Sequence, residues 1–506
     1  MSSDVRANKP DVTELTIPAF HALLREGRMR IIDIVREYLA RIEKYDGTLH
    51  STIGAGFDHI EERVYREAYD KDQWTVRALA KGNTAFPPLH GVPILLKDNY
   101  LTVCPLTSAG SRALVFMAAT RDSEVVSRLR KAGAIILIKT NMHEFALHGT
   151  TTSSCGGQTL NPYDLTRTPG GSSGGTGAAL AMNLGLVGCG TDTMNSLRSP
   201  ASACSIVGFR PSWGVVPCDG IVPVSETQDV AGPMARCVDD VRTLFDVMSG
   251  NRPRLGRAQK TTNVRIGILN AYFDLENADS SPEEITAENT IVQDIVRNAL
   301  SQVQDTADIT LVPINPNSHP DWRVSTLLAN ADTQAFEFRE CLDMFLQSSI
   351  IKKTPSRSLE AIVKSGKYDK EAVTEVFTLP LSDPETYCRT SEAYQTRLSN
   401  IVTLKESVEQ LYEENKIDAL AYPHQRHLPI KVGPTVQPGR NGILAALTGR
   451  PAVCIPAGFS PATPSAVIGV PVGLELMGQE GQDEELLDLA ECFEGILQAR
   501  KPPKWE

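Results

Sequence analysis

The chain has 506 residues and a net charge of −11, from 50 lysines and arginines against 61 aspartates and glutamates. Hydrophobic residues make up 41% and charged residues 22%, which is typical of a globular protein and excludes wholesale disorder or collagen-like repeats. The length suggests about three domains of roughly 150 residues, although large α/β proteins often form one longer unit. The acidic balance argues against a nucleic-acid partner, because phosphate binding needs a basic surface.

The sequence pattern also favours a cytoplasmic protein. No stretch reaches the roughly 18 apolar residues that a membrane span needs, and segment 1–15 is polar, without the apolar core of a signal peptide. The ten cysteines contain no CxxC pair and are too sparse for a disulfide framework. We therefore expect reduced thiols and no membrane partner.

In the first half of the chain, the predicted secondary structure changes from helices to alternating strands and helices. Residues 12–45 are predicted to be helical, and between about 90 and 250 strands alternate with helices through glycine-rich turns. In one clear unit, Ser123 caps a helix that Gly133 ends, and the strand Ala134–Ile138 follows. The helical prediction for 12–45 rests on apolar residues at three-to-four spacing, namely Ile31, Ile32, Val35, Leu39 and Ile42.

The second half begins with a polar, basic connector predicted at 251–262, followed by a strand at Val264–Leu269. Residues 320–420 are predicted to be mostly helical, with a proline-containing loop at 380–384. Short strands return at about 421–480. This order fits a compact α/β core that a more helical segment interrupts.

Three segments contain residues of catalytic type. Segment 91–99, GVPILLKDN, ends an apolar run with Lys97. Segment 168–180, TPGGSSGGTGAAL, surrounds two serines with glycines, where backbone amides can approach a ligand closely. Segment 190–202, GTDTMNSLRSPAS, places Ser196 among small polar residues. Each segment alone also fits an ordinary strand end or turn, and 168–180 matches neither a phosphate-loop nor a dinucleotide motif.

Together, the three segments resemble the amidase signature family. The resemblance rests on GVP…KDN, on GGSSGG followed by GTDT…S-x-R, and on the 75 residues that separate Lys97 from Ser172. It is strong over about 85–250 and moderate over 436–480. The pair Met194-Asn195 stands where the family usually has two glycines, and this pair resembles a mainly fungal branch of the family.

The resemblance implies an α/β fold with a central mixed, twisted β-sheet that helices cover on both faces. One large amidase-signature domain would span 1–506. Its parts would be an N-terminal helical region, a signature core with the catalytic residues, a variable and more helical substrate-side region, and a C-terminal return to the core, at 1–84, 85–250, 255–425 and 426–506 respectively. The pocket walls are expected to come largely from the variable region.

The resemblance also implies a catalytic triad, in which Ser196 is the nucleophile, Ser172 the bridging serine after a cis peptide bond, and Lys97 the base. A serine hydroxyl needs an adjacent base at pH 7. A lysine can be that base only when burial lowers its pKa and leaves the amine neutral. The apolar run Val92–Leu96 before Lys97 suits such burial.

Other residues are expected to support the triad. By resemblance, the backbone N–H groups of Thr193, Met194, Asn195 and Ser196 form the oxyanion hole. Asn tolerates left-handed dihedral angles better than Met does. The sequence therefore does not determine which backbone geometry the oxyanion hole adopts with Met194-Asn195 in place of two glycines.

Three polar neighbours and the histidines complete the expected site. Asp192 and Arg198 would pair or hydrogen-bond to hold the nucleophile loop, and Ser173 would hydrogen-bond Lys97 or Ser172. All nine histidines are interpreted as structural or surface residues. His424 and His427 in particular form a pair without cysteine or carboxylate companions nearby in the sequence, so no metal site is predicted.

The sequence therefore predicts a hydrolase that cleaves the C–N bond of small linear amides through an acyl-enzyme, without metal or organic cofactor. Three alternatives stay open: an esterase or carbamate hydrolase with the same triad, a glutaminase subunit that supplies ammonia to a partner, and a non-catalytic binding protein with this fold. Dimers are common in the family, so a homodimer is one expected assembly.

Overall fold

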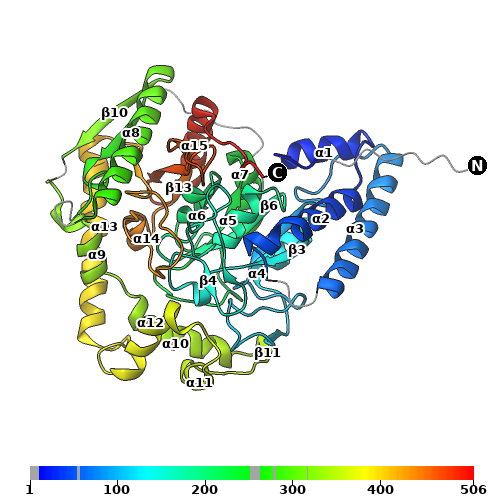
Figure 1. Ribbon diagram of the computed structural model, residues 1–506, viewed down its shortest axis with the longest axis horizontal. Coiled ribbons are helices and arrows are strands. Elements are labelled where there is room, and N and C mark those ends of the chain that lie inside the picture. Colours follow the sequence, from blue (N-terminus) through cyan, green and yellow to red (C-terminus); the bar gives the residue numbers. More distant parts are fainter. Residues whose placement is uncertain (1–10, 54–56, 251–262, 277–280, 316, 506) are drawn as a thin grey trace, which may run out of the picture.

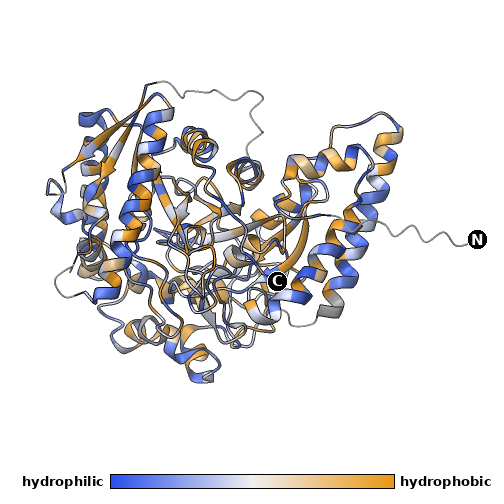
Figure 2. Ribbon diagram, turned by 45° about the horizontal axis from the view of Figure 1, so that its top comes forward, coloured by the Kyte–Doolittle hydropathy of each residue, from blue (hydrophilic) through white to orange (hydrophobic). Residues whose placement is uncertain are grey.

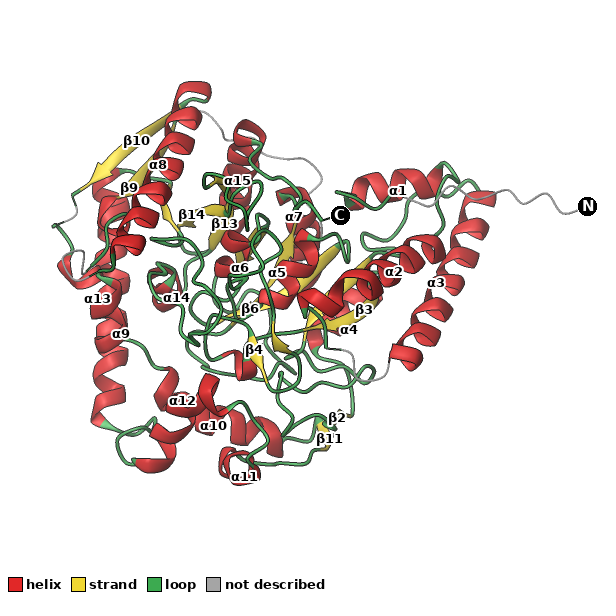
Figure 3. Ribbon diagram, viewed as in Figure 1, coloured by secondary structure: helices red, strands yellow, loops and turns green. Residues whose placement is uncertain are grey.

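The structure, a computed structural model, places a large sheet at the centre and helices around it (Figures 1 and 3). The predicted connector at 251–262 and the first ten residues of the polar N-terminal segment lie outside the described residues. Within the described part of the chain, no helix is long and apolar enough to cross a bilayer. The described residues are 11–53, 57–250, 263–276, 281–315 and 317–505.

Ten strands form the central sheet, which mixes parallel and antiparallel pairs. They are β1 (Pro93–Lys97), β3 (Ile135–Thr140), β6 (Val187–Asp192), β7 (Val207–Arg210), β8 (Val230–Ala235), β9 (Val264–Leu269), β10 (Ile309–Ile314), β12 (Ala419–Pro423), β13 (Ala452–Phe459) and β14 (Pro471–Gly478). Their order across the sheet is β10-β9-β12-β14-β13-β7-β8-β6-β1-β3. Parallel pairs occupy both ends, and antiparallel pairs join them through the middle. The predicted mixed central sheet is confirmed.

Two small antiparallel pairs lie outside this sheet, β2 (Ala118–Ala119) with β11 (Ile351–Lys353) and β4 (Thr152–Ser153) with β5 (Gly157–Gln158). Helices make up a large part of the remaining described structure. The helices are α1 (Ile17–Arg25), α2 (Ile31–Leu49), α3 (Phe57–Ala80), α4 (Glu124–Lys131), α5 (Gly174–Ala181), α6 (Arg198–Ala203), α7 (Val238–Ser249), α8 (Glu283–Thr306), α9 (Val324–Asn330), α10 (Gln334–Gln347), α11 (Leu359–Ser365), α12 (Lys370–Ser382), α13 (Glu392–Asn415), α14 (Ile443–Thr448) and α15 (Asp483–Leu497).

Helices cover both faces of the sheet, as predicted. Successive residues of a strand point to opposite faces. On β7, a side chain at Gly208 would meet Ala201 of α6, whereas the ring of Phe209 packs 5.1 Å from that of Phe245 in α7. The helices α6 and α7 therefore lie on opposite faces. In Figure 2 the outer helices carry both hydrophilic and hydrophobic residues, as expected for helices with one buried side.

The local predictions hold in part. The helical prediction for 12–45 is confirmed by two helices, α1 and α2, which are separated at Gly27, whose φ is 64°. The predicted cap is confirmed, since Ser123 Oγ accepts a hydrogen bond from the N–H of Val126 at 3.4 Å. The segment 320–420 is mostly helical as predicted, but Pro380 lies inside α12 and not in a loop.

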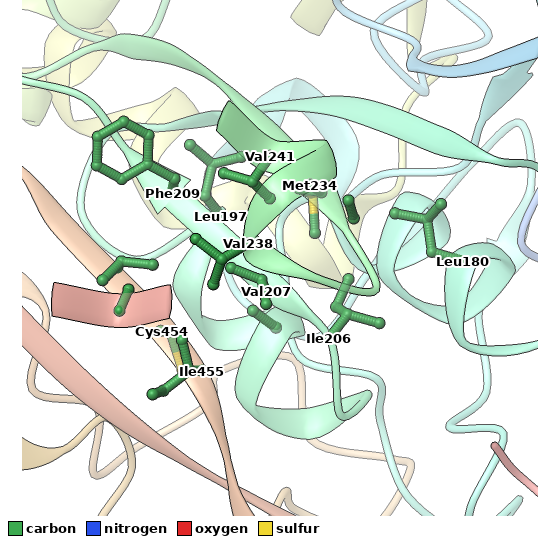
Figure 4. Close-up of a cluster of buried hydrophobic side chains, with 14 of the residues drawn as sticks. Leu180, Leu197, Ile206, Val207, Phe209, Met234, Val238, Val241, Cys454 and Ile455 are labelled. Carbon is green, nitrogen blue, oxygen red and sulfur yellow. The ribbon is translucent and has the colours of Figure 1, made fainter. Parts of the chain in front are cut away.

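The hydrophobic core reaches the residue that follows Ser196. Leu197 is fully buried and lies with Val207, Met234 and Val241 in one cluster (Figure 4). These neighbours come from β7, β8 and α7, so the loop that carries Ser196 is anchored on the sheet and on one of its covering helices.

Close packing between α6 and β7 makes Gly208 sensitive to substitution. A Cβ there would lie 2.4 Å from the carbonyl oxygen of Leu197 and 2.8 Å from Cβ of Ala201. We expect Gly208→Ala to destabilise the protein by about 1–3 kcal/mol and to lower the midpoint of thermal unfolding. The control is Gly47→Ala in α2, where the added Cβ meets nothing within 4 Å, and an equal or higher midpoint is expected. Equal losses in both variants would contradict this account.

Candidate active site

Lys97 ends β1 with its side chain fully buried. Its Nζ donates to Ser172 Oγ at 2.7 Å and to Thr191 Oγ1 at 2.8 Å. Burial lowers the pKa of Lys97 to about 7, although the negative charges of Asp192 and Asp229 act in the opposite direction. A substantial fraction of the amine is therefore neutral at pH 7 and able to accept a proton from Ser172.

Ser172 lies in the turn that leads into α5, and the Gly171–Ser172 peptide bond is cis. Thr151 holds this turn from both sides. Its Oγ1 donates to the carbonyl of Gly170 at 2.7 Å and accepts from the N–H of Gly174 at 3.1 Å. A Cβ at Gly171 would lie only 2.6 Å from the same Oγ1, so the close approach of Thr151 requires glycine there.

A backbone hydrogen bond brings the two serine segments together. The N–H of Ser173 donates to the carbonyl of Ser196 at 3.2 Å, and Ser196 itself is only 5% exposed. Among the described hydrogen bonds, none joins the hydroxyls of Ser172 and Ser196. Ser173 Oγ donates to the carbonyl of Thr191 at 3.2 Å, so the expected contact of Ser173 with Lys97 or Ser172 is replaced by one with Thr191.

The backbone from 193 to 196 presents a row of donors. In the described part of the chain, the N–H groups of these four residues have no hydrogen-bond acceptor, whereas all four of their carbonyls accept hydrogen bonds. The carbonyl of Met194 accepts from Arg198 Nη2 at 2.6 Å, and that of Asn195 from the N–H of Ser199 at 2.7 Å. Neither Met194 nor Asn195 has a positive φ, so this backbone does not require the glycines that the two residues replace.

Beneath this loop, Asp192 and Arg198 form a fully buried ion pair at 3.0 Å. Arg210 adds a second pair to Asp192 at 3.1 Å and donates to its carbonyl at 2.6 Å. Burial alone would raise the pKa of Asp192, but the two guanidinium groups outweigh it and hold the pKa well below its usual value. The carboxylate therefore stays ionised and ties the nucleophile loop to β7.

Sequence reasoning missed the residues that extend this network. Arg198 also pairs with Glu475 of β14, and Glu475 Oε2 lies 2.5 Å from His424 Nδ1. The prediction that His424 has no carboxylate companion is therefore wrong. Glu475 pairs with Tyr422 in the register of β12 against β14, which brings it beside His424. A charged residue inside the apolar run GVPVGLELMG was the one available signal.

A cavity of about 320 Å³ opens onto the donors and Ser196. The variable region contributes Val324, Leu328, Asp332, Gln334 and Ala335. This agrees in part with the expected origin of the walls. The other lining residues are Ala146, Leu147, His148, Thr193, Met194, Asn195, Ser196, Val436, Gln437, Pro438, Gly439 and Arg440.

The family follows from a comparison with known proteins. A family model described as amidase matches residues 33–487. The chain belongs to the amidase family. It is 31% identical to a probable amidase of Arabidopsis thaliana, over 98% of this chain and 92% of that protein.

Two further relatives connect the family to named activities and to a solved fold. Mandelamide hydrolase of Pseudomonas putida is 31% identical to the chain, over 96% of this chain and 92% of that enzyme. The crystal structure of peptide amidase from Stenotrophomonas maltophilia superimposes with a TM-score of 0.79 and 28% identity, covering 97% of this chain and 99% of that one. The α/β architecture found here is thus the architecture of a solved amidase.

The buried ion cluster at Asp192 gives a test of loop anchoring. Asp192→Asn leaves two guanidinium groups without their shared carboxylate, and we expect a loss of about 3–5 kcal/mol in the free energy of unfolding. Asp33→Asn is the control, because the exposed pair of Asp33 with Arg30 contributes less than about 1 kcal/mol. Urea unfolding of both variants measures the difference, and comparable losses would show that the cluster does not hold the loop.

Proposed function

We propose that this amidase-family chain hydrolyses small linear carboxylic amides through an acyl-enzyme on Ser196. The observation that carries the proposal is the 2.7 Å hydrogen bond between the buried Lys97 Nζ and Ser172 Oγ, in a site that also contains Ser196. The relatives support the substrate class, since they include a mandelamide hydrolase and a peptide amidase.

In the first step, neutral Lys97 takes the proton of Ser172 while Ser172 takes that of Ser196, whose Oγ attacks the amide carbon. This requires the two serine hydroxyls to come within hydrogen-bond distance when substrate binds, as catalytic hydrogen bonds commonly do. The free N–H groups of residues 193–196 stabilise the oxyanion.

Collapse of the tetrahedral intermediate breaks the C–N bond, and the proton returns from Lys97 through Ser172 to the leaving nitrogen. Water then attacks the acyl carbon, with the same relay removing its proton, and the carboxylic acid product leaves Ser196. No cofactor enters this sequence of steps.

Other functions fit the site less well. Esters and carbamates share the acyl step, so such activity would use the same residues. Glutamyl-tRNA amidotransferase subunits A are also relatives, for example one of Thermodesulfovibrio yellowstonii at 28% identity over 96% of this chain. A non-catalytic binding role would require Met194 to close the site, but Met194 lines a cavity of about 320 Å³ that still reaches Ser196.

Several finer expectations stay predictions. The mainly fungal branch is one, because the relatives named here are plant and bacterial proteins. The homodimer, the cytoplasmic location and the boundaries of the four parts of the chain are others.

The nucleophile is tested by labelling with a fluorophosphonate probe, read by intact mass. We expect one adduct on the wild type and none on Ser196→Ala or Lys97→Ala. Ser127→Ala, on the exposed side of α4, is the control and should label fully. A wild type that is folded and unlabelled, or an adduct that survives in Ser196→Ala, would refute the assignment.

The base is tested by the pH dependence of the labelling rate. The folded-state pKa of Lys97 is lowered to about 7, so the amine is protonated and inactive below that pH and neutral above it. We expect the second-order rate constant to rise about tenfold per pH unit up to about pH 7 and to level off above it. A limb near pH 4 would instead implicate His148, whose pKa burial lowers to about 4. A flat profile would exclude both groups.

A further inference from the structure

The cavity at Ser196 contains an arginine that the proposed mechanism does not use. Arg440 lies two residues before the N-cap of α14 and lines this cavity. Its Nε donates to the carbonyl of Gln437 at 3.1 Å, and its Nη1 lies 3.5 Å from the carbonyl of Gly171, at the outer limit of a hydrogen bond. Gly171 immediately precedes Ser172, so the guanidinium is close to the catalytic turn.

The guanidinium of Arg440 has no direct carboxylate partner among the described residues, although the charge of Asp192 acts on it from a distance. In the described part of the chain no ion pair includes Arg440, and its Nη2 has no hydrogen-bond partner. Burial lowers the pKa of Arg440 to about 10, so the group remains a cation at pH 7. Arg440 is half-buried, and a cation that contacts no carboxylate and lines a cavity favours a ligand of opposite charge.

The other titratable groups of the cavity leave this cation unbalanced. Asp332 accepts two hydrogen bonds from Gln334, at 3.2 Å from its N–H and 2.9 Å from its Nε2, and forms no ion pair with Arg440. Burial lowers the pKa of His148 to about 4, so its ring is neutral at pH 7. The cavity is therefore positive at the end formed by Arg440.

Resting on the proposed function, we propose that the substrate is a small amide with a free carboxylate, which the guanidinium fork of Arg440 binds. A carboxylate offers two oxygens that match the two N–H groups of such a fork. The cavity volume of about 320 Å³ is at the lower end of the range of ligand pockets and has room for a small amide with a carboxylate. Arg440 would thus select among amides, while Lys97, Ser172 and Ser196 perform the cleavage.

The test compares two amides that differ only in the distal group, succinamate with a carboxylate and butyramide with a methyl group. Ammonia release gives kcat/KM for each. We expect the wild type to prefer succinamate by about tenfold or more, and Arg440→Gln to abolish this preference mainly through a higher KM for succinamate. The matched control is Arg265→Gln, because Arg265 likewise donates to backbone carbonyls, of Asn415 and Lys416, and is remote from the cavity. Its preference should equal that of the wild type.

Binding of succinate decides the inference without catalysis. By calorimetry, Ser196→Ala should bind succinate, and the double variant with Arg440→Gln at least about tenfold more weakly. Should the glutamine variant not fold, Arg440→Lys, which keeps the charge and loses the fork, is expected to give an intermediate preference and affinity. An unchanged preference in the Arg440 variants, an equal loss on both amides, or no binding of succinate would overturn the proposal. Absence of hydrolysis of either amide, with no probe adduct, refutes the proposed function alone.

Discussion

A lysine amine enclosed in the protein without a carboxylate partner is the constraint on which the rest of the site depends. Lys97 is fully buried, and in the described ranges its polar contacts are hydroxyl and carbonyl oxygens. Lys139, on the adjacent strand β3, is equally enclosed but lies 3.8 Å from Asp98, and its pKa is about 8. Because an adjacent anion favours the protonated amine, a lysine base needs neighbours such as Thr191 that hydrogen-bond without carrying charge.

This constraint explains why Asp192 is surrounded by arginines. Asp192 directly follows Thr191 on β6, and its negative charge raises the pKa of Lys97. The ion pairs with Arg198 and Arg210 offset the negative charge of the Asp192 carboxylate and so weaken its effect on Lys97. The same cluster that anchors the loop of Ser196 therefore also limits the protonation of Lys97. Stability of the loop and basicity of Lys97 are two consequences of one set of buried charges.

The sequence predicts those features of the fold and of the site that depend on residues close together in the chain. The strand end at Lys97, the glycine-rich turn at Ser172, the serine loop at 196 and the mixed sheet all follow from short motifs and from the family that they resemble. The contacts between residues that are far apart in the sequence do not follow from these motifs. Thr191 is 94 residues from Lys97, and Glu475 is 51 residues from His424. These contacts depend on strand register, which no local spacing encodes.

The Met194-Asn195 pair stands where the family resemblance places two glycines, in a backbone whose conformation does not require glycine. Glycine is required where φ is positive or where another atom comes too close, and neither residue here has a positive φ. Arg198 holds the carbonyl of Met194, and the N–H of Gly442 donates to Asn195 Oδ1 at 3.0 Å. A side-chain contact from α6 and a backbone N–H of the residue before α14 thus orient a segment whose own N–H groups have no acceptor among the described residues.

In the proposed mechanism, the fold also separates the residues that react from those that would contact the rest of the substrate. Lys97 and Ser196 are carried by segments whose neighbours belong to the central sheet, so their positions are fixed by the core. The other cavity walls come from α9, α10 and the loop at 436–440, and loops accept substitution more readily than strands. In the proposed mechanism, the residues that set substrate preference are therefore separate from the Lys97–Ser172 contact. Arg440 stands between the two groups, since it lies in the loop at 436–440 and its Nη1 lies 3.5 Å from the carbonyl of Gly171, the residue before Ser172.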